Sequence, residues 1–312
     1  MPQHRRLPSW QLFAIAVIIW STTWHAILYQ LAHTTPELGV ALRFGLAGLL
    51  GLGIAAWRGD SLRFSARGHA LLALQGVFMY SLAYFAVYHA EVHVPSGLVA
   101  VGYSASPLVN GIGAWLLWRT AISARFLAGG ALCLVGVTLI FWPEFARIGE
   151  AGAGGATLLG AGFTVAAVLL SSVGNLAATR NVDHQLPFWP ALGWGMVYGA
   201  ALSLVVVLAL GQPLGLPSPS AEPAWWASLA YLSIAGSVIA FACFLALQQR
   251  VGPGPASTIG VMTPVLALVV SALFEGFRPV LLTWLGVSLA VAGNVLILKP
   301  RLRPSAVSPA TE

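Results

Sequence analysis

Aromatic side chains recur at helical spacing inside segments that are otherwise apolar. Tyr80 and Tyr84 stand four residues apart, so they share one face of a helix. A second group near the start of the chain holds Trp20, Trp24 and His25. Indole and phenol rings can line an apolar pocket while their N–H and O–H groups orient a ligand. Core packing explains the same residues equally well, and both interpretations stay open.

Polar groups that could complete such a pocket are spread along the chain. Ser171 and Asn175 repeat the spacing of Ser21 and His25 at an offset of 150 positions. Polar groups related in this way suit a central binding site, although hydrogen bonds between helices explain them equally well. The expected site residues are Trp20, Trp24, His25, Tyr80, Tyr84, Tyr103, Ser104, Ser171, Asn175, Thr258 and Met262.

Arg43 is a charged residue inside an apolar segment. It lies about seven residues from the start of that segment, roughly 10 Å deep. We expect a structural ion pair with Glu37 or Glu91, and capture of a substrate carboxylate is the less favoured alternative. No acidic residue lies near the middle of an apolar segment. An organic cation would lack a counter-charge there, so a neutral or zwitterionic ligand fits better.

The sequence lacks the motifs of enzymes, metal sites and nucleotide-driven pumps. His89 and His93 are four residues apart, but Glu91 lies in the wrong place for the zinc pattern H-E-x-x-H. A Walker loop, a G-x-S-x-G elbow and a paired nucleophile and base are all missing. We therefore expect no metal, no cofactor and no enzymatic activity.

Composition places the chain in a membrane. Its 312 residues are 58% hydrophobic and only 8% charged, whereas a soluble domain has about 25% charged residues. The mean hydropathy is +0.84. Basic cytoplasmic loops explain the net charge of +6 better than nucleic-acid binding does. Cys133 and Cys243 both lie inside apolar segments, so neither is placed for a disulfide or a metal site.

The apolar segments predict an all-α membrane protein with ten transmembrane helices. Each segment is about 20 residues long, and in lipid it must satisfy its own backbone hydrogen bonds. The expected helices are Trp10–Leu31, Pro36–Trp57, His69–Ala90, Pro95–Trp118, Phe126–Trp142, Ala156–Ala178, Pro187–Leu210, Trp225–Leu247, Pro255–Phe274 and Val280–Leu298.

The basic residues predict the orientation in the membrane. With the N-terminus in the cytoplasm, the outer side holds Arg147 and Arg278 alone among the basic residues outside the helices. The cytoplasmic side then holds Arg5, Arg6, Arg58, Arg63, Arg67, Arg119, Arg125, Arg180, Arg250, Lys299, Arg301 and Arg303. We expect a multi-pass protein of the plasma (inner) membrane whose tails, residues 1–9 and 299–312, are cytoplasmic.

The fourth and ninth expected helices carry the same pattern. A shift of 157 positions takes Gly97 to Gly254 and Pro107 to Pro264. A proline in the middle of a helix removes one hydrogen bond and bends the helix. A static kink is one explanation, but the bend occurs twice. We therefore favour hinges at these prolines and glycines that open and close a path.

The repeat divides the chain into two halves, residues 10–142 and 155–298. Equivalent positions are separated by five helices, which is an odd number, so the two halves must cross the membrane in opposite directions. Inverted repeats are typical of secondary transporters, which bind their substrate near the middle of the membrane between the halves.

Several further residues occur in an order typical of one transporter family. They are Trp20-Ser21-Thr22-Thr23-Trp24, Arg43-Phe44, Pro107, Pro264, and the glycine pairs Gly129/Gly136 and Gly286/Gly293. Over about residues 10–298 the chain resembles the drug/metabolite transporter superfamily, in the branch with two EamA-type repeats. Its aromatic interior is similar to that of the aromatic amino acid exporters. The resemblance implies a carrier of small metabolites that works by alternating access.

These features together predict a secondary transporter that exports small metabolites, above all amino acids including aromatic and large apolar ones. A drug or nucleotide-sugar carrier is the alternative within this class, while an intramembrane enzyme or a scaffold is less well supported. The expected partners are a small-molecule substrate and the lipid bilayer, without nucleic acid. A monomer is sufficient, although a homodimer is compatible with the sequence. We expect weak or no obligatory proton coupling, with His25 as the proton carrier if coupling exists.

Overall fold

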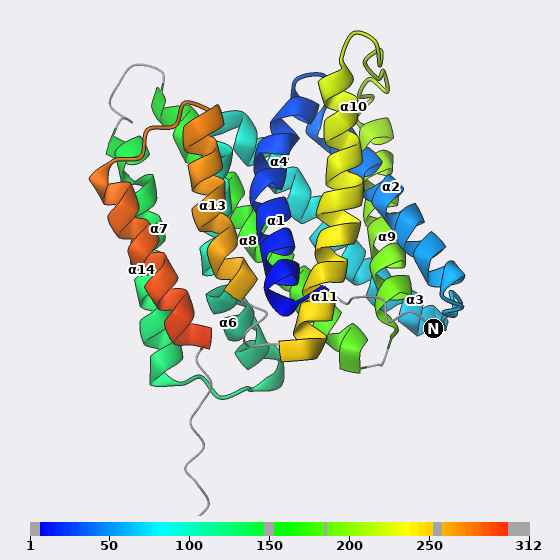
Figure 1. Cartoon of the computed structure of the whole chain (residues 1–312), viewed down its shortest axis with the longest axis horizontal. Helices are drawn as coiled ribbons and strands as arrows, with labels where there is room; N and C mark the ends of the chain where they lie inside the picture. The colour runs from blue at the N-terminus through cyan, green and yellow to red at the C-terminus, as the bar shows by residue number, and fades with distance from the viewer. Residues whose placement is uncertain (1–6, 147–152, 184–185, 252–257, 299–312) are drawn as a thin grey trace, which may run out of the picture.

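The computed structural model describes residues 7–146, 153–183, 186–251 and 258–298, and the helices and contacts below lie in these ranges. They form one bundle of helices that run side by side (Figure 1), and the described ranges contain no strand. Seven segments are long and apolar enough to cross a membrane. Residues 96–118, 258–274 and 281–298 are also helical, which fits the expected ten. The predicted all-α membrane fold is therefore confirmed.

Two of the first five segments contain a change of helix type. The elements of the first half are α1 (Ser9–Leu31), α2 (Pro36–Trp57), α3 (Ala66–Val77), η1 (Phe78–Leu82), α4 (Ala83–His93), α5 (Ser96–Gly102), η2 (Tyr103–Ala105), α6 (Ser106–Trp118) and α7 (Ala124–Ala146). The π-helix η1 joins α3 to α4, and the 3-10 turn η2 joins α5 to α6.

One segment of the second half has a similar π-helix in the middle. The elements are α8 (Ala153–Asp183), α9 (Phe188–Ala209), α10 (Pro223–Ala230), η4 (Tyr231–Ile239), α11 (Ala240–Val251), α13 (Thr258–Phe274) and α14 (Leu281–Leu298). A shift of 157 positions places η1 on residues 235–239, inside η4. The third and eighth membrane segments thus share the same local distortion, as equivalent elements of a repeat should.

Local sequence explains where several helices begin and end. The Thr35 hydroxyl accepts a hydrogen bond from the backbone N–H of Leu38, and Pro36 occupies the first turn of α2. Ser65 caps α3 in the same way. Gly211 follows the end of α9 with a φ of 61°, a backbone conformation that glycine adopts without strain.

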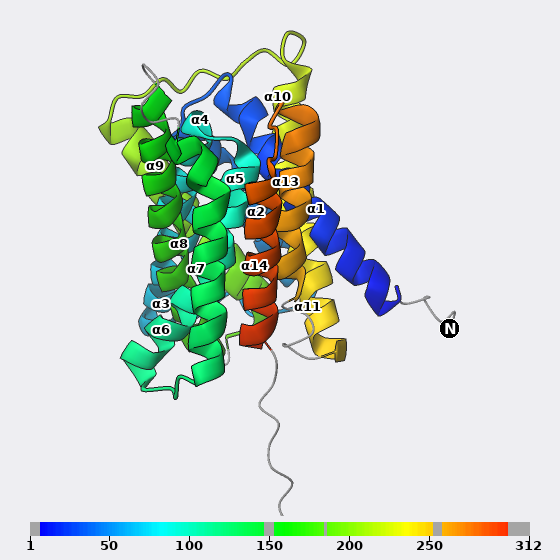
Figure 2. The same ribbon diagram turned by 90° about the vertical axis from the view of Figure 1, so that its left-hand side faces the viewer.

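The glycines that the repeat relates form the contact between α7 and α14. A Cβ atom added at Gly129 would lie 2.7 Å from the carbonyl oxygen of Gly293. One added at Gly136 would lie 2.5 Å from the carbonyl oxygen of Gly286. The contacts run in opposite order along the two helices, so α7 and α14 are antiparallel neighbours (Figure 2). The 157-residue shift converts one contact into the other, which is the relation expected of inverted repeats.

The two repeated prolines have different surroundings. Pro107 lies in the first turn of α6, directly after the 3-10 turn η2, so its segment is interrupted. Pro264 lies inside α13, which continues through it. Gly97 packs tightly, since an added Cβ would lie 2.8 Å from the Cβ of Ser271. Gly254 lies outside the described residues, and a hinge function at these four positions stays a prediction.

Candidate functional site

Three histidine–glutamate pairs among the described residues lie near the ends of α1, α2, α4, α10 and α13, within about two turns of them. The paired nitrogen and oxygen atoms are 3.1 Å apart for His25–Glu275, 3.0 Å for His33–Glu222 and 2.8 Å for His89–Glu37. We call this part of the bundle the His–Glu end. Because each pair joins segments that are far apart in the sequence, the pairs tie the ends of the helices together there.

Glu275 is the most extensively bonded carboxylate of the His–Glu end. Its Oε2 accepts hydrogen bonds from the backbone N–H of Ser96 and the hydroxyl of Ser271, each at 2.9 Å. Its Oε1 accepts from the Ser96 hydroxyl and faces Nδ1 of His25. One side chain thus connects α1, the start of α5 and the end of α13. A carboxylate is also favoured at the start of α5, because the helix presents free N–H groups there.

Glu37 does not pair with Arg43, contrary to one of the expected ion pairs. Its Oε1 lies 2.8 Å from Nε2 of His89, and its Oε2 accepts a hydrogen bond from Nε2 of Gln212 at 3.0 Å. Gln212 is held in turn by the hydroxyl of Thr35. The physical reason for the correction is position: Glu37 lies in the first turn of α2, where these partners reach it, whereas Arg43 lies nearly two turns deeper.

Arg43 is buried without an ion pair to any described acid. Its side chain is 2% exposed, and its Nε and Nη1 atoms have no hydrogen-bond partner among the described residues. The guanidinium carbon lies 4.8 Å from the ring centre of Tyr84 and 5.0 Å from that of Phe44. The rings stabilise the cation through their π faces, but they leave N–H groups of the guanidinium unused.

Glu91 is the second buried charge that lacks a partner. The residue is 6% exposed, and neither carboxylate oxygen has a hydrogen-bond partner among the described residues. Its charge interacts with those of Arg43 and Glu275, yet no direct ion pair forms. The expected Arg43–Glu91 ion pair is therefore also wrong: the groups face the same region but do not touch.

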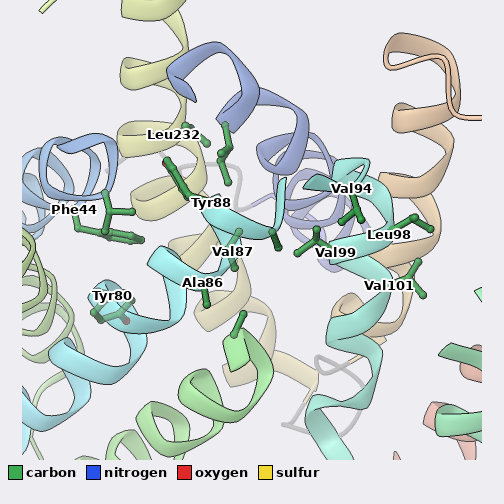
Figure 3. Close-up of a cluster of buried hydrophobic side chains, with 14 of the residues drawn as sticks. Phe44, Tyr80, Ala86, Val87, Tyr88, Val94, Leu98, Val99, Val101 and Leu232 are labelled. Atoms are coloured by element: carbon green, nitrogen blue, oxygen red, sulfur yellow. The ribbon is translucent and has the colours of Figure 1, made fainter. Parts of the chain in front are cut away.

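The aromatic residues near Arg43 come from four membrane segments. Tyr84 of α4 contacts Phe44 of α2 at 4.6 Å between ring centres, and Figure 3 shows Phe44 beside Tyr80 in the buried cluster. Tyr103 contacts Trp24 of α1 at 5.3 Å. Half-buried Trp24, Tyr84 and Tyr103 all pack against this one cluster.

Polar groups join these aromatic rings. The Tyr103 side chain lies near that of Tyr84 and near the Ser171 hydroxyl of α8. Four of the expected site residues, Trp24, Tyr84, Tyr103 and Ser171, therefore gather with Arg43. We call these five residues the Arg43 cluster. They come from α1, α2, α4, η2 and α8, so both halves of the chain contribute.

Several expected site residues lie apart from the Arg43 cluster. The Trp20 indole donates a hydrogen bond to the Gly236 carbonyl at 3.0 Å and contacts Phe241, and it packs with Phe244 against a second apolar cluster. Tyr80 is fully buried beside Phe44, and the Ser104 carbonyl accepts a hydrogen bond from Asn294. His25 is paired with Glu275 and also lies apart. So do Asn175, which is half-buried, and the two residues Thr258 and Met262, which lie on an exposed face of α13.

A cavity of about 310 Å³ lies between the fourth membrane segment, where Gly102, Ala105 and Val109 line it, and the helices α7 and α8. Its lining is almost entirely apolar, and Leu134, Val165 and Leu169 in it belong to the exposed apolar surface. None of the expected site residues lines it. The cavity therefore opens toward the surface that lipid would cover, and it is separate from the Arg43 cluster.

The sequence did not reveal that His25 pairs with Glu275, or that Arg43 has no acidic partner among the described residues. Ser271 and Glu275 are four residues apart near the end of an apolar segment, so they share a helix face. This spacing could have indicated that the Glu275 carboxylate turns toward the protein. No comparable signal predicts that Glu37 binds His89 rather than Arg43, because that choice depends on how three helices pack.

Comparison with known proteins decides the family. The model of the EamA-like transporter family matches residues 9–142 and again residues 158–299. The chain belongs to the EamA-like transporter family. It is therefore a multi-pass membrane transporter of small molecules. The double match agrees with the repeat read from the sequence and with the paired glycines of α7 and α14.

Relatives of this EamA-like transporter span nearly its whole length. The inner membrane transporter YedA of Escherichia coli K12 is 27% identical over 305 residues, which cover 92% of this chain and 89% of YedA. Protein PagO of Salmonella typhimurium is 23% identical over 270 residues and covers 85% of this chain and 84% of its own. A solved crystal structure that is 21% identical covers 92% of this chain and 95% of its own with a TM-score of 0.66, which shows the same fold.

Proposed function

We propose that this transporter carries amino acids, above all those with aromatic or large apolar side chains, out of the cell. The observation that carries the proposal is the state of Arg43: a guanidinium that is 2% exposed, without an acidic partner among the described residues, in a group of aromatic rings. A buried charge without a partner is costly. A substrate carboxylate would supply the missing partner.

The surroundings of Arg43 suit the rest of such a substrate. Arginine forms strong, charge-assisted hydrogen bonds with a carboxylate. Trp24, Tyr84 and Tyr103 offer ring faces and edges to an apolar or aromatic side chain. Because α1, α2, α4 and α8 all contribute, a movement between the two halves would change the shape of the site, as alternating access requires.

The proposal includes an orientation in the inner membrane. Loop charges favour cytoplasmic N- and C-termini, which places the His–Glu end outside. The test is the labelling of single cysteines in intact cells with a membrane-impermeant thiol reagent. A cysteine at Gly215, where the exposed loop has open space, should react, and one at Ala121 should not. The reverse pattern would overturn the orientation.

Amino-acid flux in proteoliposomes tests the proposed cargo. The parent protein should move labelled phenylalanine and methionine, and R43Q should lower that flux about tenfold or more, because hydrogen bonds to charged groups are worth about 1.5–3 kcal/mol. Arg58 at the exposed end of α2 supplies the control variant R58Q, which should transport like the parent. A parent protein that moves quaternary amines but no amino acid would refute the cargo.

A further inference from the structure

Glu91 is a buried acid that has no role in the amino-acid site proposed around the Arg43 cluster. We infer that Glu91 binds the ammonium group of the substrate while Arg43 binds its carboxylate, so that the transporter recognises the α-amino acid zwitterion. This inference rests on the proposed function and names the second charged group of the same site. It predicts that molecules with only one of the two charges are poor substrates.

The first support is that Glu91 is buried and unsatisfied. It is 6% exposed, and both of its carboxylate oxygens lack a hydrogen-bond partner among the described residues. Buried carboxylates normally have a cation or several donors close by. The free carboxylate of Glu91 and the free guanidinium atoms of Arg43 are thus two complementary halves of a site.

The second support is the helix geometry. Tyr84, Tyr88 and Glu91 follow one another at intervals of four and three residues, so they lie on one face of α4. Tyr84 contacts the Arg43 guanidinium, and Glu91 lies about two turns further along the same face. Arg43 and Glu91 are close enough for their charges to interact but not for a direct bond. An α-amino acid, whose ammonium and carboxylate groups are both bonded to the α-carbon, can place one group at each of these residues.

The neighbouring polar groups are compatible with this assignment. The Tyr88 hydroxyl donates a hydrogen bond to Oε1 of Gln30 at 2.7 Å, while Nε2 of the fully buried Gln30 has no partner among the described residues. This free amide is a further donor near Arg43 for a carboxylate. Glu275, the other acid near Glu91, is already bonded to Ser96, Ser271 and His25. Of these two acids, Glu91 is therefore the one whose carboxylate oxygens remain available to bind a cation.

The electrostatic balance of the site also favours a zwitterion. When the Glu91 carboxyl is ionised, Arg43 and Glu91 have opposite charges, so the pair is neutral together, and a bound zwitterion keeps it neutral. A carboxylic acid without an amine would leave Glu91 uncompensated, and an amine without a carboxylate would leave Arg43 uncompensated. Each of these ligands would have to leave one charge buried without a partner, which disfavours its binding.

The experiment compares three substrates that share one phenyl ring. Phenylalanine carries both charges, 3-phenylpropionate lacks the ammonium, and phenethylamine lacks the carboxylate. With the parent protein in proteoliposomes, unlabelled phenylalanine should compete with labelled phenylalanine at least tenfold better than either analogue. The E91Q variant should lose about tenfold in apparent affinity for phenylalanine, about 1.4 kcal/mol, while its affinity for 3-phenylpropionate stays the same or rises.

A matched variant and two contrary results make the test decisive. E222Q removes another glutamate of the His–Glu end, one that pairs with His33, and should leave all three affinities unchanged. If the parent protein binds 3-phenylpropionate as tightly as phenylalanine, the inference fails whether or not E91Q folds, while the proposed amino-acid transport stands. If E91Q transports phenylalanine like the parent and changes only the pH dependence of transport, Glu91 binds a proton and the inference fails. If the parent moves no amino acid, the proposed function fails as well.

Discussion

Gly129 of α7 lies so close to Gly293 of α14 that a Cβ atom on the first would come within 2.7 Å of the carbonyl oxygen of the second. A second contact joins Gly136 to Gly286 at 2.5 Å. The four glycines let two helix backbones approach more closely than any side chain would allow, as small residues do in membranes. The packing of the fifth and tenth membrane segments therefore depends on the absence of a single methyl group at each position.

Replacing Gly136 by alanine should destabilise the transporter. Its Cβ would also meet the backbone nitrogen of Ala290 at 2.6 Å, so α7 and α14 must move apart. We expect a loss of about 1–3 kcal/mol, as for overpacked cores. Thermal unfolding in detergent, followed by size-exclusion chromatography, measures the effect.

The control for this substitution is Gly162→Ala in α8, where an added Cβ meets nothing within 4 Å. Alanine should be neutral there or stabilise the helix by about 0.5–1 kcal/mol, because glycine loses more backbone freedom on folding. Equal unfolding temperatures for G136A and G162A would contradict the close packing of α7 against α14.

Removing the Glu275 carboxylate should loosen the His–Glu end. E275A leaves the Ser96 N–H, the Ser271 hydroxyl and His25 without their shared acceptor. Hydrogen bonds to a charged group are worth about 1.5–3 kcal/mol, so we expect a form in which the helices of this end have separated to become about tenfold more populated or more. The labelling rate of a cysteine at Val101, which is 2% exposed in α5, measures that population.

This labelling experiment uses a background in which Cys133 and Cys243 are replaced by alanine, since both are free thiols. E222A is the matched control, because the Glu222 side chain is 39% exposed and an exposed ion pair contributes little. Labelling at Val101 that is as slow in E275A as in the parent would show that Glu275 does not hold this end closed.

Trp24 and Tyr84 should matter for flux more than for folding. Alanine at either position removes a half-buried ring from the Arg43 cluster, and a lost aromatic contact is worth about 0.5–1.5 kcal/mol beyond its buried area. Phenylalanine and methionine flux in proteoliposomes should fall by about threefold to tenfold. Protein abundance should be unchanged.

The Trp20→Ala variant provides the contrast. Its indole is bonded to Gly236 and packed against Phe241, so this change should lower the unfolding temperature and leave the flux per folded molecule close to that of the parent. If all three alanine variants transport phenylalanine like the parent, the rings of Trp24 and Tyr84 are packing and the substrate path lies elsewhere.

The sequence alone predicts the helical membrane fold and the family well, but only part of the site. Apolar length and charge position place the membrane segments, and α2 has the bounds predicted for it, Pro36–Trp57. The partners of His25 and Glu37, and the lack of an acidic partner for Arg43 among the described residues, could not be predicted in this way. Each depends on which of several acids at the helix ends turns toward which neighbour, and packing between distant segments decides that choice.

The repeated prolines differ in a way that bears on the transport cycle. The segment with Pro107 is interrupted by a 3-10 turn, whereas α13 runs unbroken through Pro264. In a carrier built from inverted halves, the opposite state arises when the halves exchange conformations. The difference between the two segments then corresponds to one of the two states of the transport cycle. In the other state we expect the segment that contains Pro107 to become continuously α-helical through residues 103–105, and α13 to be interrupted at residues 260–262.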